Sequence, residues 1–153
     1  MTTETHAYLE RFEYLHSEVK KAIHDMGKEE LEWKPLPSDT SSPCVLATHI
    51  VGVEAFNIHQ LVGGIDVHRN RDAEFAAKGA SAKELEALLD KTAAITRTVL
   101  MKASSNDLAK SVQPRPDQAP VNLRLAILRS LDHIGQHLGH LSLTKQLYHA
   151  RKG

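Results

Sequence analysis

The sequence has one cysteine, no net charge and no long apolar run, and each shortage excludes a class of protein. Cys44 alone cannot form an intramolecular disulfide or supply a cysteine-rich zinc site. Lysine plus arginine and aspartate plus glutamate number 19 each, so no net positive field attracts a phosphate backbone, and we expect no nucleic-acid partner. The N-terminus has no basic run followed by an apolar one, and no segment approaches the apolar length of a membrane span. We therefore predict a cytoplasmic protein with no membrane partner.

Size and composition point to one ordinary domain. The 153 residues are enough for one sizeable core and too few for two domains with a linker. Hydrophobic residues make up 41% of the chain and charged residues 25%, which is typical of a globular protein rather than a disordered one. No internal repeat or low-complexity segment is present, so residues 1–153 are expected to form a single domain.

Four segments repeat apolar residues at helical spacing, and breaks in the pattern separate them. These segments cover residues 4–26, 43–62, 81–104 and 121–150. The connections at 28–42 and 64–80 are long, and the second allows at most a short helix. The sequence pattern gives almost no indication of β-strands. The pattern predicts an all-α protein, a four-helix bundle with long crossover connections whose order need not be simple up-and-down.

Local signals mark the expected ends of these helices. Gly27 is expected to end the first helix as the residue after its C-cap. Ser42 followed by Pro43 is typical of an N-cap and a first helical position, and the glycine pair at 63–64 should stop that helix. Ser81 opens a capping box at the start of the third helix.

Ten histidines stand out in a chain of this size, and they are dispersed along it. His133 and His137 are four residues apart, which on a helix leaves them about 40° apart around the axis and about 6 Å apart along it. Helical zinc sites use this spacing, but ten histidines also produce such a pair by chance. The surrounding apolar residues must therefore decide what the pair does.

A helical projection places this pair in the middle of a wide apolar face. Apolar residues flank the two histidines on both sides, and Leu125, Leu143 and Leu147 form one of those flanks, which we expect to be buried. His49 falls on the apolar stripe of the second helix. A third imidazole is therefore expected to point into the core.

Buried imidazoles need partners for both ring nitrogens, and several left unpaired in one core cost roughly a few kcal/mol. A shared divalent cation removes that cost. We predict that His49, His133 and His137 each supply one nitrogen to a metal and leave a position open, as catalytic sites do. Three separately hydrogen-bonded core histidines are the alternative. Three imidazoles suit zinc best, and nickel, iron and manganese remain possible.

Other polar groups are candidates for the chemistry near this site. His140 lies three residues beyond His137 and is the candidate catalytic residue, although it can also replace a ligand or support one from outside. Glu54 projects about 140° from His49, which argues against its acting there as a general base. Cys44 is expected to be structural. The remaining histidines are expected to be solvated or singly hydrogen-bonded: His6, His16, His24, His59, His68 and His149.

Three stretches carry a further pattern, and their order and spacing match a known superfamily over most of the chain. They are Gly27 to Pro35 followed by Ser41-Ser42, then Leu46 to Glu54, and finally Asp132 to His140. Together they resemble the DinB/YfiT-like superfamily, which includes bacillithiol-, mycothiol- and glutathione-dependent transferases.

The resemblance implies a four-helix bundle, often a homodimer, with a divalent metal near one end. In such proteins one histidine of the second helix and a pair in the last helix bind the metal, and these map onto His49, His133 and His137. Many relatives have Arg and Gln around the glycine after the last ligand, whereas this chain has Leu138 and His140. Substrate contacts are therefore expected to differ.

These features favour a transferase that uses a metal and a low-molecular-weight thiol to act on a small electrophile. Two alternatives stay open. A metal-dependent hydrolase is one, because an open three-histidine site also activates water. The other is a protein without turnover that binds a metal or small ligand in a stress response.

A patch of small residues bears on assembly. Gly135, Gly139 and Ser142 lie together opposite the predicted ligand face, where each glycine costs up to about 1 kcal/mol in helix propensity. Close approach of another helix compensates for that cost, so we expect an interface with the crossover segment or with a second subunit. The second case predicts a homodimer, and an exposed, tolerated patch is the alternative.

Overall fold

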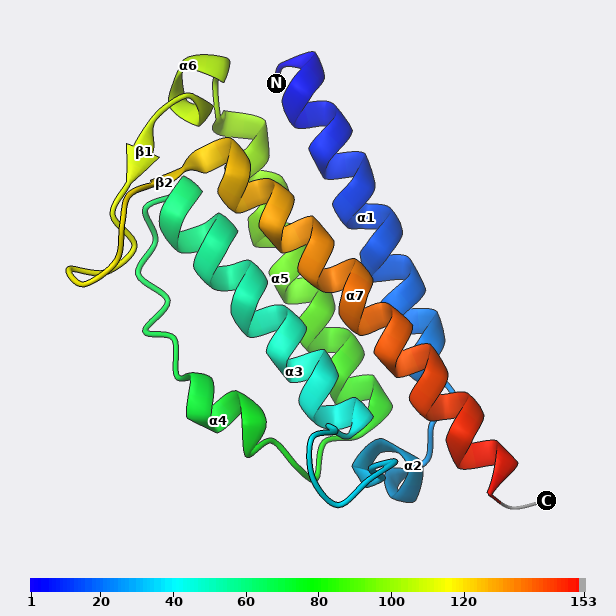
Figure 1. Cartoon of the computed structure of the whole chain (residues 1–153). Coiled ribbons are helices and arrows are strands. Elements are labelled where there is room, and N and C mark those ends of the chain that lie inside the picture. The colour runs from blue at the N-terminus through cyan, green and yellow to red at the C-terminus, as the bar shows by residue number, and fades with distance from the viewer. Residues whose placement is uncertain (152–153) are drawn as a thin grey trace.

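Four long helices form the protein, and the computed structural model describes residues 1–151 (Figure 1). Their bounds are Thr3–Ile23 for α1, Pro43–Glu54 for α3, Ala82–Lys102 for α5 and Leu123–Ala150 for α7. The second helix continues beyond Glu54 as a π-helix, η1, over Ala55–Val62. The expected four-helix bundle is confirmed, and all four predicted segments are helical.

The bundle is not simple up-and-down. In Figure 1, α1 and α7 run downward, whereas α3 and α5 both run upward. α1 packs against α5 and α7, and α3 packs against the same two helices from the opposite corner. The chain between η1 and α5 must therefore return along the outside of the bundle, and it carries the short helix α4, Arg71–Phe75.

The other connections contain short elements. The first holds α2, Lys28–Glu32, and the third holds α6, Ser105–Leu108. After α6, the strand β1, Ser111–Val112, pairs antiparallel with β2, Val121–Asn122. Ser111 lies opposite Asn122, and Val112 lies opposite Val121. The expectation of essentially no strand missed this pair, because its hydrogen bonds are decided by how the proline-rich loop folds back rather than by an alternating pattern.

Most predicted helix ends are present. The Ser42 side chain accepts a hydrogen bond from the Val45 amide, and Ser81 forms the capping box at the start of α5. Gly64 follows the π-helix with a φ of +69°, which glycine adopts at little cost. The prediction for Gly27 is wrong: α1 ends at Ile23, and Gly27 has extended backbone and serves as the N-cap of α2.

Apolar stripes of all four long helices meet in one core. Its largest fully buried side chains include Phe12, Leu15, Ile23, Ile50, Ile58, Leu89, Leu100, Ile127, Ile134 and Leu141. Removing such side chains from water is the main term that stabilises the bundle.

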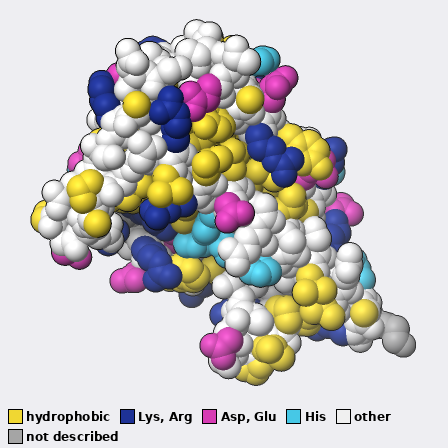
Figure 2. Space-filling model, turned by 45° about the horizontal axis from the view of Figure 1, so that its top comes forward, with side chains coloured by type: hydrophobic (Ala, Val, Ile, Leu, Met, Phe, Trp, Pro, Cys, Tyr) yellow, Lys and Arg dark blue, Asp and Glu magenta, His cyan; other side chains and the backbone are white. Residues whose placement is uncertain are grey.

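The outer flank of α7 corrects the sequence prediction. Leu125, Leu143 and Leu147 are 42%, 54% and 41% exposed, because the bundle covers a narrower arc of α7 than the apolar pattern occupies. Hydrophobic side chains reach the surface over much of the face shown in Figure 2. The small-residue patch is also uncovered: a Cβ at Gly135 or Gly139 would meet nothing within 4 Å, so the crossover segment does not pack there.

The longest apolar run lies inside the bundle. Contrary to the sequence expectation, Pro43–Val62 is long and apolar enough by composition to cross a membrane, with a mean hydropathy of 1.2 over its best window. Half of that window is buried within the protein, and the run packs on α5 and α7. Core helices of globular proteins have this same composition.

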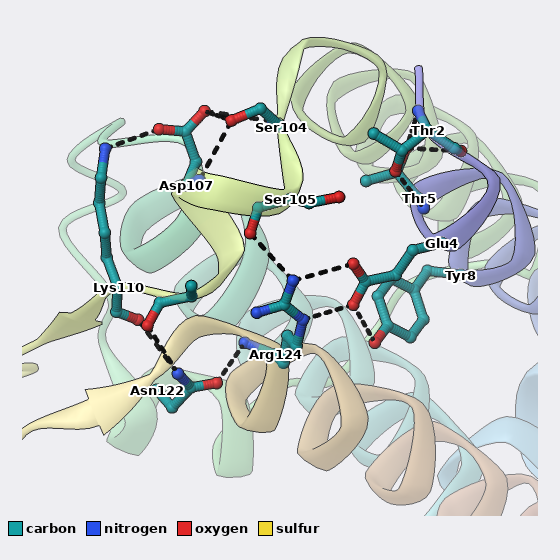
Figure 3. A network of polar contacts seen from close by, with 11 residues as sticks. Thr2, Glu4, Thr5, Tyr8, Ser104, Ser105, Asp107, Lys110, Asn122 and Arg124 are labelled. Carbon is teal, nitrogen blue, oxygen red and sulfur yellow. Dashed lines mark hydrogen bonds and ion pairs between the residues drawn. The ribbon is translucent and has the colours of Figure 1, made fainter.

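Polar contacts fix the start of α7 (Figure 3). The guanidinium of Arg124 donates to both carboxylate oxygens of Glu4, at 2.6 and 3.1 Å, and to the Ser105 carbonyl at 2.9 Å. Asn122 caps the helix by accepting from the Arg124 amide at 3.0 Å. These contacts tie α1, α6 and α7 together, which sets the register of α7 along α1.

Candidate metal centre

Three histidines from two helices converge in the bundle. His49 comes from α3, and His133 and His137 lie one turn apart on α7. His133 Nε2 lies 3.1 Å from His49 Nε2 and 3.0 Å from His137 Nε2. The structure therefore brings together the three residues chosen as metal ligands from the sequence.

The spacing of these nitrogens fits a metal ion. All three candidate ligand atoms lie within 4.8 Å of one another. A tetrahedral ion bound at 2.0–2.1 Å holds its nitrogen ligands about 3.3 Å apart, close to the separations observed. No protein carboxylate or thiol joins this group in the described chain, which leaves room for an exogenous ligand.

The surroundings of His133 and His137 favour the neutral imidazole that a metal ligand must be. Burial, reinforced by the neighbouring His137 and His49, lowers the pKa of His133 to about 3. Burial and the nearby His49 and His140 lower the pKa of His137 to about 4. The rings of His133 and His137 therefore each keep a lone pair at neutral pH.

A carboxylate from the crossover orients His49. Glu74 of α4 is buried, and its Oε2 lies 2.7 Å from His49 Nδ1. Burial alone raises the pKa of Glu74, but hydrogen bonds from Arg69 and His49 outweigh it and lower the pKa. The carboxylate accepts a hydrogen bond from the Nδ1–H of His49. The lone pair of His49 therefore lies on Nε2 and faces the other two histidines.

Arg69 holds that carboxylate in turn. Its Nε and Nη2 donate to the two oxygens of Glu74 at 2.7 and 2.8 Å, a bidentate pair whose charges balance. The Phe75 ring covers His49, with ring centroids 4.6 Å apart. Gly52 makes room for the arrangement, since a Cβ there would lie 2.1 Å from Glu74 Oε1. Residues of α4 and of the segment before it thus hold the candidate metal ligand His49 in place.

The sequence pattern does not indicate Glu74 and Arg69 as residues of the site. Their segment has no helical periodicity, and Asn70, which caps α4 by accepting from the Ala73 amide, was the local sign of a short helix. Gly52 was the other sign, because a glycine inside a helix often marks close approach of another group. Neither sign identifies which carboxylate arrives.

His140 supports the cluster from α7. Its Nδ1 lies 3.2 Å from His137 Nδ1, so it contacts a candidate ligand on the side away from the other two. When His137 offers its lone pair through Nε2, its Nδ1 proton is donated to His140, and His140 then carries its own proton on Nε2. In that tautomer the Nε2–H of His140 is a hydrogen-bond donor.

A pocket of about 680 Å³ adjoins the cluster. His137 and His140 are among its lining residues, as are the apolar side chains of Trp33, Leu143 and Leu147. Figure 2 shows histidine side chains at the surface in the middle of this face, with hydrophobic side chains beyond them toward the C-terminus. The two leucines that were expected to be core residues line this pocket instead.

Two further candidates lie away from the cluster. The Glu54 carboxylate is fully buried and contacts His16 and Thr96, which agrees with its exclusion as a base for the site. Cys44 is fully buried as well, and burial raises the pKa of its thiol. A buried, protonated thiol is a poor nucleophile, in line with a structural role.

The sequence model of the mycothiol S-transferase family matches residues 7–150. The chain belongs to this family. A comparison with curated proteins returned no match. The DinB-like resemblance seen in the sequence is thereby confirmed at the level of the family.

Solved structures share the fold at low sequence identity. A conserved protein from Enterococcus faecalis is 16% identical with a TM-score of 0.75, covering 96% of this chain and 97% of that one. A DinB-like protein from Bacillus subtilis is 16% identical with a TM-score of 0.72, covering 92% and 90%. A mycothiol-dependent maleylpyruvate isomerase is 14% identical with a TM-score of 0.67. This chain is covered to 92% in that comparison but spans only 63% of the isomerase.

Proposed function

We propose that this protein is a metal-dependent thiol transferase that joins a low-molecular-weight thiol to a small electrophile. The observation that carries the proposal is the convergence of three imidazole nitrogens from α3 and α7, one of which, that of His137, belongs to a residue that also lines a pocket. Family membership supports a reaction that involves a thiol such as mycothiol. Zinc is the proposed metal, with nickel, iron and manganese as the other candidates.

Each residue of the site has a part in this proposal. His49, His133 and His137 hold the ion, and a bound divalent cation supplies positive charge that lowers the pKa of a thiol beside it. Glu74 fixes the tautomer of His49. The Nε2 proton of His140 is available to an oxygen of the acceptor, which makes His140 the proposed catalytic donor.

A metal-dependent hydrolase is the second candidate. The same open set of three imidazoles is compatible with activating water in place of a thiol. Product formation that requires added thiol supports the transferase, whereas product formation from water alone supports the hydrolase. Binding of a metal or small ligand without turnover of any substrate would indicate a binding protein rather than an enzyme.

Metal analysis tests the first step of the proposal. Untagged, chelator-treated protein should bind stoichiometric zinc in a calorimetric titration, and His49→Ala and His137→Ala should remove tight binding because each takes away a ligand. His24→Ala, an exposed histidine paired with Glu86, is the matched control and should bind as the parent protein does. Substoichiometric metal that none of these substitutions changes would remove the basis for the proposal.

Assembly and location remain predictions. The uncovered patch at Gly135 and Gly139 is available to a second subunit, and we propose a homodimer that uses it. The protein is proposed to act in the cytoplasm on small molecules, without nucleic-acid or membrane partners.

A further inference from the structure

The pocket beside the histidine cluster has a distinctive lining. Leu36, Leu143 and Leu147 line it and are 57%, 54% and 41% exposed. These side chains come from two separate segments, the loop after α2 and the last turns of α7, and they face one shared space. Apolar surface gathered in a concave pocket is the usual mark of a ligand site, whereas single exposed leucines are not.

The pocket wall is held in place without a ligand. Trp33 packs edge-on against Tyr148 of α7, with ring centroids 5.7 Å apart, and Arg151 stacks on Trp33 at 5.3 Å. Within the loop, the Thr40 hydroxyl accepts from the Leu36 amide at 3.1 Å and donates to its carbonyl at 2.8 Å. A preformed pocket spends less free energy on ordering when a ligand binds.

Among the described residues, the pocket lining contains a negatively charged side chain and no Lys or Arg. Asp39 lines it and has a φ of 60°, which turns the loop at that point. None of the described Lys or Arg side chains lines the pocket. Arg151, which stacks on the lining residue Trp33, is outside the lining and is paired with Glu29 at 2.5 Å. In the metal-free protein, a carboxylate that enters the pocket loses hydration and meets Asp39, with no Lys or Arg among the described lining residues to replace the water.

We propose that this pocket receives an uncharged, apolar group of the substrate and discriminates against a carboxylate at the same position. The inference rests on the proposed function, because His137 joins the pocket to the histidine cluster. An apolar group seated against Leu143 and Leu147 places the neighbouring atoms of the same molecule beside His137 and His140. The substrate class is therefore an apolar electrophile with its reactive carbon close to that apolar group.

Trp33 is the only tryptophan in the chain and reports on the pocket directly. Chelator-treated protein at pH 8 is titrated with 4-phenyl-1-butanol and with 4-phenylbutyrate, while tryptophan fluorescence is recorded. The alcohol should give a saturable change, and the carboxylate should bind at least about tenfold more weakly because its charge is desolvated.

Variants locate the effect. Leu143→Asp and Leu147→Asp should weaken binding of the alcohol, and neither residue contributes to the buried core. Leu128→Asp is the matched control, since Leu128 is 50% exposed on the same helix but lines a different part of the surface. Asp39→Asn should reduce the difference in affinity between the alcohol and the carboxylate, and asparagine tolerates the positive φ at this position.

Three results overturn the inference: no saturable change with the alcohol, equal binding of both probes, or equal loss in Leu128→Asp and Leu143→Asp. Because the titration uses metal-free protein, its outcome is independent of metal binding. Loss of zinc binding in the calorimetric titration would instead count against the proposed function while leaving the pocket result intact.

Discussion

Two groups of histidines lie inside this bundle, and the groups that their Nε2 atoms face are of opposite kinds. In the first group, His16 and His59 reach a fully buried carboxylate: His16 Nε2 lies 2.6 Å from Glu54, and His59 Nε2 lies 3.1 Å from the Thr96 hydroxyl, which donates to Glu54 at 2.5 Å. In the second group, His49, His133 and His137 place nitrogens against one another with no carboxylate between them.

The difference shows what a buried histidine needs in order to be structural. The Glu54 carboxylate accepts from His16 Nε2 and from the Thr96 hydroxyl, so this group links α1, α3, η1 and α5 within the protein, and His16 Nδ1 is the one buried ring atom of the group without a hydrogen-bond partner in the described structure. The three-histidine group keeps its carboxylate, Glu74, on the outer side of His49, where it orients the ring and leaves the lone pair free. Lone pairs that face one another repel, and only protons or a cation between them relieve the repulsion. We infer that the first group stabilises the fold and that the second exists for a ligand.

The largest effect is expected from a change in the Glu54 group, which consists of Glu54, His16, His59 and Thr96. Glu54→Ala leaves His16 Nε2 and the Thr96 hydroxyl buried without their acceptor, which should lower the free energy of unfolding by about 3–5 kcal/mol. Urea unfolding of metal-free protein measures this loss. Zinc affinity of the folded variant should stay unchanged. Glu54→Gln keeps one oxygen acceptor and should cost less, and a parallel loss of zinc affinity would contradict the separation of the two groups.

A smaller effect is expected when the carboxylate behind the three-histidine group is removed. Glu74→Gln removes the carboxylate that fixes the tautomer of His49, and loss of such an outer partner lowers metal affinity by about 10- to 100-fold. Calorimetry with zinc measures the change. Gly52→Ala should act in the same direction, because its Cβ would lie 2.1 Å from Glu74 Oε1 and displace the carboxylate.

Gly135→Ala is the matched control for that comparison. It also adds a methyl group to a helical glycine, but its Cβ would meet nothing within 4 Å, so zinc affinity should not change. Equal affinities in Gly52→Ala and Gly135→Ala would show that the position of Glu74 has no influence on the site.

The smallest effect is the contribution of His59 to the pH dependence of stability, to which the lowered pKa values of His133 and His137 also contribute in metal-free protein. Burial lowers the pKa of His59 from its ordinary value of 6.5, although the nearby Glu54 opposes the shift. The folded protein therefore binds fewer protons at His59 than the unfolded chain, and the stability present above pH 6.5 is lost as the pH falls through that value. His59→Gln should flatten the fall in unfolding free energy of metal-free protein between pH 7 and pH 5, measured by urea unfolding. An identical slope in both proteins would exclude this assignment.

The sequence predicted much of this fold because the signals are local. Ser42 and Ser81 cap helices where expected, since an N-cap depends only on the next few residues. Leu143 and Leu147 were placed in the core because periodicity shows which side of a helix is apolar, not how much of that side the other helices cover. The small strand pair was missed because its hydrogen bonds depend on how the proline-rich loop folds back, and Gly27 caps a short helix, α2, that has no periodic pattern.

The sequence by itself determined the four helices, the face of α7 that carries His133 and His137, and the inward position of His49, because periodicity and capping act within one helix. Only the tertiary structure decided that Glu74 and Arg69 stand behind His49, that Glu54 closes with His16, and that the loop at Trp33 completes a pocket with α7. These contacts join residues far apart in the chain. Their geometry depends on how helices and crossover pack together, which no local pattern of residues records.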